Sequence, residues 1–128
     1  MPEPIVFISR SRIAPGMRDE FGAAFRRAVQ AMAETKPRTA LEAAYLNETG
    51  TEVTIVHVFP DATAMLAHFE GSDERTASVA NLITLIGFEV YGRAPAAAIA
   101  QLRLEARRSG FPVEFQAESI GGFLRAPA

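Results

Sequence analysis

The stretch Thr51–Phe59, TEVTIVHVF, is the most strand-like segment of the chain. Valine, isoleucine and phenylalanine favour the extended backbone of a β-strand. The stretch carries one charged residue, and apolar side chains occupy both its odd and its even positions. A strand of this kind is usually covered on both faces. We therefore expect it to lie in the interior of a sheet.

Three other segments show strand patterns. Ile5–Ile13 opens with an apolar run and then alternates, and Ala40–Glu48 alternates before the turn Thr49-Gly50. Phe88–Gly92 is a short apolar segment that follows a glycine. Together with the first stretch, these segments predict four strands.

Helical patterns fill the intervals between the strands. Apolar residues recur every three or four positions from Met17, which predicts an amphipathic helix that ends before Lys36-Pro37. A second helix is expected after Asp61, a residue suited to the N-cap, with an interruption at 71–73 and a continuation over Thr76–Leu85. The order β-α-β-β-α-β predicts an α+β, ferredoxin-like domain with a four-stranded antiparallel sheet.

The chain continues beyond this unit. We expect residues 1–93 to form the ferredoxin-like domain and residues 94–128 to form a C-terminal helical extension. Pro95 favours the first turn of a helix, and Gly110 favours its end. Val113–Gln116 has the composition of a further short strand. The extension is expected to pack on the same domain or on a dimer partner.

Composition excludes several functions. The chain has 128 residues, a net charge of −2 and a pI near 5.7, so no overall field attracts it to nucleic acid or to an anionic membrane. It has no cysteine, which excludes disulfides, thiolate metal sites and thiol nucleophiles. No apolar segment is long enough to span a bilayer, and the first residues lack the basic region of a signal peptide. These features favour a cytoplasmic location.

The two apolar faces of Thr51–Phe59 suggest a dimer. Two helices can cover one face of a four-stranded sheet, and the other face would be an exposed apolar patch in a monomer. We therefore predict a homodimer packed sheet to sheet, a dimeric α+β barrel with an internal chamber for a small apolar or aromatic ligand. The side chains expected to face this chamber, away from the helices, are Val53, Ile55, His57 and Phe59.

Two motifs resemble those of the antibiotic biosynthesis monooxygenase-like group of dimeric α+β barrel proteins. They are Ile13–Gly16 with Phe21 in the helix that follows, and the run Val56–Asp61 that leads to Met65–Phe69. The likeness covers about residues 5–92. The group includes cofactor-free quinol-forming monooxygenases, heme-degrading monooxygenases, isomerases and peroxidases, and a shared fold does not choose among these activities.

The chain departs from the heme-degrading members of that group. Those proteins carry an asparagine where this chain has Ser9, and they need a histidine in the segment that corresponds to Thr76–Leu85, which has none. Many relatives also have tryptophan in place of Phe59. The resemblance therefore implies an activity without heme or another cofactor.

The two histidines are the catalytic candidates. His57 interrupts an apolar strand, and its imidazole is suited to accept a substrate proton, or else to form a hydrogen bond in the dimer seam. His68 lies at the edge of the buried stripe of the second helix, where it acts in catalysis or covers the sheet edge. The histidines lack the i, i+4 spacing of a helical zinc pair, so no metal site is expected.

Five further residues are expected to contact a substrate. Tyr45 and Asn47 can orient a phenol or quinone by hydrogen bonds, and Ser9 leaves space for a ligand beside Phe59. Each also has a structural explanation, such as a tyrosine that buries its ring and keeps its hydroxyl in water. The set is Ser9, Tyr45, Asn47, Phe59 and Tyr91.

Two functions fit these patterns. In the first, a cofactor-independent monooxygenase deprotonates a small aromatic or quinol-type substrate with His57 or a tyrosine, and the resulting anion reduces dioxygen. In the second, the same dimer binds a small ligand, or none, without turnover. A polar-lined, accessible cavity above about 300 Å³ favours the enzyme, and a barrel filled by side chains favours the binding or structural protein.

Overall fold

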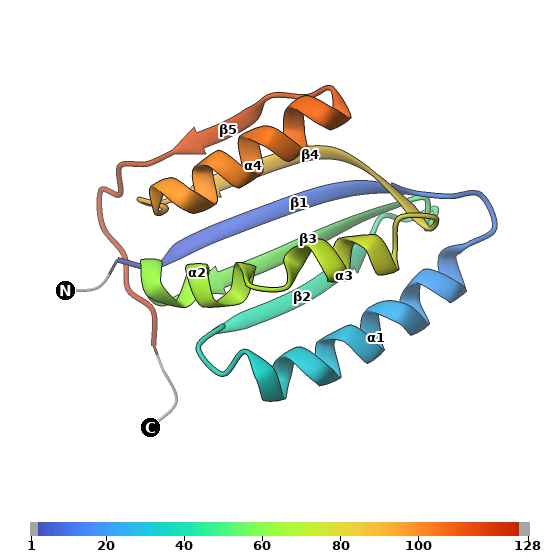
Figure 1. Cartoon of the computed structure of the whole chain (residues 1–128), viewed down its shortest axis with the longest axis horizontal. Coiled ribbons are helices and arrows are strands. Elements are labelled where there is room, and N and C mark those ends of the chain that lie inside the picture. Colours follow the sequence, from blue (N-terminus) through green and yellow to red (C-terminus); the bar gives the residue numbers. More distant parts are fainter. Residues whose placement is uncertain (1–2, 126–128) are drawn as a thin grey trace.

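The computed structural model describes residues 3–125, which form one sheet with helices packed on one of its faces (Figure 1). The elements in chain order are β1 (Ile5–Ile13), α1 (Arg18–Thr35), β2 (Leu41–Leu46), β3 (Glu52–Phe59), α2 (Ala62–Phe69), α3 (Ser72–Ser78), β4 (Ile83–Tyr91), α4 (Ala96–Ser109) and β5 (Val113–Gln116). The fold is α+β and ferredoxin-like, as predicted. Among the described residues, no helix is long and apolar enough to cross a membrane.

The sheet has five strands in the order β2-β3-β1-β4-β5. The predicted number of four is therefore wrong. The first four strands pair antiparallel, and β5 pairs parallel to β4. A parallel neighbour requires a crossover connection, and α4 provides it on the helical side of the sheet. The segment Val113–Gln116 adds the fifth strand at the edge next to β4.

The second helical region ends earlier than the sequence pattern predicted. α3 stops at Ser78, and β4 begins at Ile83, within the segment Thr76–Leu85 that was expected to be helical. Ile83 pairs with Ile13 and Leu85 pairs with Ser11 across the sheet. The apolar residues of so short a segment fit a helical and an extended period equally well, so pairing with β1 decides the outcome.

The start of α2 follows the prediction. The Asp61 side chain accepts a hydrogen bond from the backbone N–H of Ala64 at 2.8 Å, and this bond lowers the pKa of the Asp61 carboxyl. Arg38 forms an ion pair with the same carboxylate. The N-cap therefore fixes both the first turn of α2 and the segment that leads into β2.

The core lies between the sheet and the helices. Phe7 and Phe59 of the sheet pack against Met65 of α2 and Leu102 of α4, and all four side chains are buried. A second cluster joins Ile13 and Val53 to Phe21 of α1. The helices thus cover one face of the sheet through two adjoining apolar clusters.

The face of β3 that packs against the helices is the opposite of the predicted one. Val53, His57 and Phe59 are 1%, 8% and 0% exposed because they lie beneath the helices, and Ile55 shares their face. Val56 is only half-buried, as are Thr54 and Val58 on the same outer face. Both faces of this strand are apolar, so its sequence alone does not say which face the helices cover. The side chains that were expected to face a chamber between two sheets therefore face the helices of the same protomer.

The packing of Phe59 gives a first prediction. Phe59→Ala removes a fully buried ring from the contact with Met65, and we expect the free energy of unfolding to fall by about 3–5 kcal/mol. Urea denaturation followed by circular dichroism measures the change. Leu104→Ala on the exposed side of α4 is the control and should cost less than about 1 kcal/mol. Equal losses for the two variants would contradict the assignment of Phe59 to the core.

Candidate functional site

A cavity of about 400 Å³ lies between the sheet and the helix layer. Phe7, Ser9 and Ser11 of β1 form part of its floor, and Phe25 of α1 and Leu102 of α4 belong to its walls. Most of the lining surface is apolar, although half of the lining residues have polar side chains. Its volume lies within the range typical of small-molecule sites. The cavity can therefore enclose a small, largely apolar molecule.

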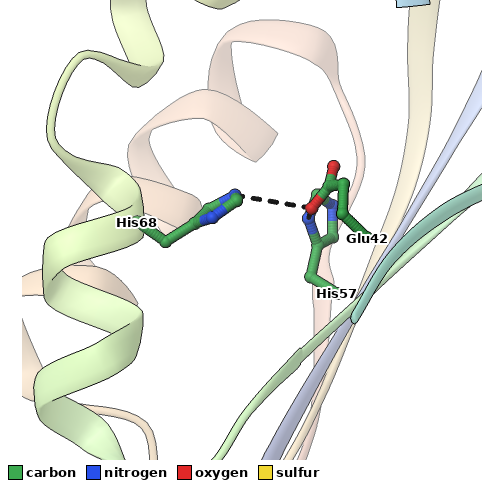
Figure 2. Close-up of side chains that lie close together, drawn as sticks. All are labelled: Glu42, His57 and His68. Carbon is green, nitrogen blue, oxygen red and sulfur yellow. Dashed lines mark hydrogen bonds and ion pairs between the residues drawn. The ribbon is translucent and has the colours of Figure 1, made fainter. Parts of the chain in front are cut away.

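Three titratable side chains meet at this cavity (Figure 2). His57 comes from β3, Glu42 from the adjacent β2, and His68 from α2 above the sheet. The Nδ1 atom of His57 lies 2.6 Å from the Oε1 atom of Glu42, and the Nε2 atom of His68 lies 3.6 Å from that same oxygen. The carboxylate of Glu42 is thus shared between two imidazoles.

The pairing of β2 with β3 explains the contact between Glu42 and His57. These two residues are direct partners in the antiparallel register, so their side chains project from the same face of the sheet. The His57 ring also stacks on Phe7, with 4.7 Å between ring centroids and 14° between ring planes. The stack and the hydrogen bond fix the orientation of the imidazole.

The contact with Glu42 defines the chemistry of His57. An ionised Glu42 accepts a hydrogen bond from Nδ1–H, which leaves Nε2 as the nitrogen with a free lone pair. His57 is a lining residue of the cavity. A carboxylate that orients an imidazole and stabilises its protonated form is the arrangement found in many general bases. The pair can therefore take up a proton from a bound molecule.

His68 has a different character. Burial lowers the pKa of His68 to about 3, and the charge of His57 when it is protonated and the positive charges of Arg75 and Lys36 act in the same direction. A neutral His68 satisfies its neighbours when the Thr39 hydroxyl, 2.7 Å away, donates to Nδ1 and Nε2–H points toward Glu42. His68 therefore lies beside the Glu42 carboxylate and is unsuited to accept a proton near neutral pH.

Arg75 of α3 is the positively charged side chain among the residues that line the cavity. Its guanidinium donates hydrogen bonds to the backbone carbonyls of His68 and Glu70 at the end of α2. Burial lowers the pKa of Arg75, and the charge of Glu42 opposes that shift. Arg75 thus joins α2 to α3 and places a positive charge near the carboxylate.

The cluster of Glu42, His57 and His68 also has the composition of a metal site, since one ligand atom from each lies within 4.8 Å of the others. The sequence spacing predicted no metal, and the distances argue in the same direction. Ligand atoms around tetrahedral zinc lie roughly 3.3 Å apart, whereas Glu42 and His57 approach to 2.6 Å. That separation fits a shared proton, and Arg75 adds a positive charge beside the cluster.

Of the seven predicted site residues, four lie in the cavity wall or beside the cavity. Ser9, His57 and His68 line the cavity. Phe59 is fully buried in the core beside the cavity and is absent from its lining. Ser9 therefore joins the histidines in one site, while Phe59 supports that site from behind.

Three other predicted substrate contacts lie away from the cavity. Tyr45 is 60% exposed on the outer face of the sheet, and Tyr91 donates a hydrogen bond to Glu89 on the same outer face. Asn47 lies in the turn before β3, where its side-chain oxygen accepts hydrogen bonds from the backbone N–H groups of Thr51 and Glu52. The period of the strand predicted a common face for Tyr45 and Asn47, but Tyr45 lies on the face without helices and Asn47 lies beyond the end of β2.

Glu42 is the main site residue that sequence reasoning missed. It is the one charged residue within the strand LEAAYL, and it stands opposite His57 in the register. An acidic residue on the inner face of an alternating strand is the signal that points to it. This signal can be recognised only when the structure shows which face of the strand lies beneath the helices.

The chain belongs to the antibiotic biosynthesis monooxygenase family, whose family model matches residues 4–80. No curated protein matches the chain. The fold resembles that of MupZ from Pseudomonas fluorescens, with a TM-score of 0.72 and 18% identity over 96% of this chain and 95% of MupZ.

Other structures match a smaller share of this chain. SnoaB, a cofactor-independent oxygenase from Streptomyces nogalater, has a TM-score of 0.59 and 16% identity over 73% of this chain and 96% of its own. Rv0793 from Mycobacterium tuberculosis has the same TM-score and 17% identity over 74% of this chain and 99% of its own. At such identities the likeness establishes the fold.

The neutral state of His68 predicts a pH dependence of stability. The unfolded chain binds a proton at His68 near pH 6.5, whereas the folded protein binds it only near pH 3. Stability is therefore retained above pH 6.5 and falls as the pH drops below that value, by at most about 1.4 kcal/mol per pH unit. We expect the free energy of unfolding in urea to decline from pH 6.5 to pH 5.5.

The matched variant is His68→Gln, which keeps a hydrogen-bonding side chain without the titration. Over the same pH interval, its free energy of unfolding should decline by about 1 kcal/mol less than that of the wild type. The same slope in the wild type and in this variant would show that His68 does not carry the effect.

Proposed function

We propose that this protein is a cofactor-independent monooxygenase that oxidises a small aromatic or quinol-type substrate, with the Glu42–His57 pair as general base. The observation that carries the proposal is the 2.6 Å contact between His57 and Glu42 at the wall of a cavity of about 400 Å³. SnoaB, a cofactor-independent oxygenase, has the same fold and supports the choice of reaction.

The proposed reaction needs no bound redox group because the substrate supplies the electrons. His57 removes a proton from an acidic CH₂ or phenolic O–H group and leaves an electron-rich anion. The anion transfers an electron to dioxygen, and the two radicals combine to form a carbon–oxygen bond. Loss of water then gives the ketone or quinone. For a CH₂ group the balance is CH₂ plus O₂ to C=O plus H₂O.

The lining suits such a substrate. Phe7, Phe69 and Phe88 present rings to the cavity, where they can stack against a planar aromatic molecule. An apolar enclosure also keeps water away from the anion, so less reorganisation of solvent is needed when the electron leaves. A protein that only stores an apolar ligand has no use for a buried carboxylate and imidazole, which are costly to desolvate.

The test is oxygen consumption with a panel of anthrone- and quinol-type compounds. We expect His57→Ala to lower kcat by about 10²–10⁴-fold, because it removes the proton acceptor. Glu42→Gln should lower kcat less and alter its pH dependence. Tyr91→Phe, on the outer face, is the control and should retain wild-type activity.

Two outcomes oppose the proposal. Full activity in His57→Ala would remove His57 from the mechanism. An absence of oxygen consumption with every compound would favour the non-catalytic binding protein.

We also propose that the protein forms a homodimer through the outer face of the sheet. Ile8 and Val56 lie on this face with Tyr45, which is 60% exposed, and no helix of the described chain covers it. An apolar face of this kind usually packs against another surface. Residues 1–93 would form the ferredoxin-like domain in each copy, and residues 94–128 the extension. The absence of cysteine is in keeping with a cytoplasmic protein.

Substitution on the outer face tests the dimer. Val56→Lys places a charge at the centre of the proposed interface, and we expect the variant to elute as a monomer in size-exclusion chromatography with light scattering. Leu104→Lys, on the exposed side of α4, is the matched control and should elute as the wild type does. A monomeric wild type, or a dimeric Val56→Lys, would exclude this interface.

A further inference from the structure

The helix α4 is part of the cavity, although it lies outside the region that defines the family. The family model ends at residue 80, and α4 begins at Ala96. Gln101, Leu102 and Glu105 of α4 nonetheless line the cavity. The extension therefore forms a wall of the proposed active site and contributes polar groups that the family motif does not include.

Glu105 is the ionisable group of that wall. Burial raises the pKa of the Glu105 carboxyl, and the charge of Asp73 acts in the same direction, while Gln101 and Arg108 oppose the shift. The carboxyl thus keeps its proton more readily than an exposed glutamate. In either protonation state the carboxyl oxygens accept a hydrogen bond from a hydroxyl group of a bound molecule.

The position of this wall is fixed by a contact between helices. Gln101 donates a hydrogen bond from Nε2 to the Ser72 hydroxyl at 2.6 Å, which holds α4 against the start of α3. Glu105 lies one helical turn after Gln101, on the same side of α4. The carboxyl is therefore carried on a supported helix rather than on a loop.

An independent observation comes from the sheet. The Ser11 side chain lines the same cavity, is 1% exposed, and its hydroxyl has no hydrogen-bond partner among residues 3–125. A buried hydroxyl without a partner costs about 1–3 kcal/mol. This cost is recovered when a bound molecule brings a hydrogen-bonding atom to that place. Ser11 and Glu105 belong to opposite layers, so a molecule held between the sheet and the helices can reach both.

We propose that α4 builds a specificity subsite in which Glu105, together with Ser11 on the sheet, binds oxygen substituents of the substrate away from the carbon that reacts. The preferred ligands would then be aromatic molecules that carry hydroxyl groups rather than unsubstituted ones. This inference rests on the proposed function for its substrate class. It concerns recognition, so it can be tested without turnover.

The experiment uses two product-type probes that do not consume oxygen, anthraquinone and an anthraquinone with one hydroxyl on each outer ring. Their dissociation constants are measured by equilibrium dialysis with the full chain. We expect the wild type to bind the hydroxylated probe at least about tenfold more tightly. Glu105→Leu should remove most of that preference and leave the affinity for anthraquinone within about twofold.

Three further variants separate recognition from structure. Glu105→Gln retains a hydrogen-bonding side chain and should keep most of the preference. Ser11→Ala should reduce the preference for the hydroxylated probe by about threefold or more, without loss of stability, because it removes a hydroxyl that has no partner. Glu114→Gln, on the exposed part of β5, is the matched control and should bind both probes as the wild type does.

The outcomes distinguish the two proposals. Equal loss of affinity for both probes in Glu105→Leu, an unchanged preference in that variant, or no preference in the wild type would overturn the subsite. A preference that depends on Glu105, combined with no oxygen consumption by the wild type, would reject the oxygenase and keep the subsite. Oxygen consumption that depends on His57, combined with no effect of Glu105→Leu on the binding preference, would reject the subsite and keep the oxygenase.

Discussion

The register between β2 and β3 is the constraint on which the site depends. It sets Glu42 directly opposite His57 and so makes the 2.6 Å contact between carboxylate and imidazole. A slip of one residue would turn Glu42 to the outer face, since successive side chains of a strand point to opposite sides. His68 would then lose the carboxylate that lies 3.6 Å from its Nε2 atom. The site is thus a property of strand pairing, not of a local motif.

The layer between the sheet and the helices combines an apolar core with polar groups that are costly to bury. Phe59 and Met65 stabilise one end of it, and the histidines lie at its border with the cavity. A hydrogen bond to a specific neighbour offsets the cost of burying each histidine. The neighbour is Glu42 for His57 and Thr39 for His68. Ser11 has no such neighbour within residues 3–125. Departures of this kind from good core packing are expected where a protein binds something.

The extension changes the site as well as the sheet. α4 packs on β4 and leads to β5, and it also places Gln101 and Glu105 on the cavity wall. MupZ matches over 96% of this chain, whereas SnoaB matches over 73%. The family model covers the acid–base pair but ends before α4. The proposed chemistry and the proposed recognition would then belong to different parts of the chain.

The sequence by itself determined the β-α-β-β-α-β order, the N-cap at Asp61 and the candidacy of His57 and His68, because these follow from local periods and residue chemistry. It did not determine which face of β3 the helices cover, since both faces are apolar, nor the pairing that extends β4 back to Ile83. Glu42 became a site residue, and Tyr45 and Tyr91 ceased to be cavity candidates, only when the layers were packed. Those outcomes depend on contacts between segments far apart in the chain, which no local pattern encodes.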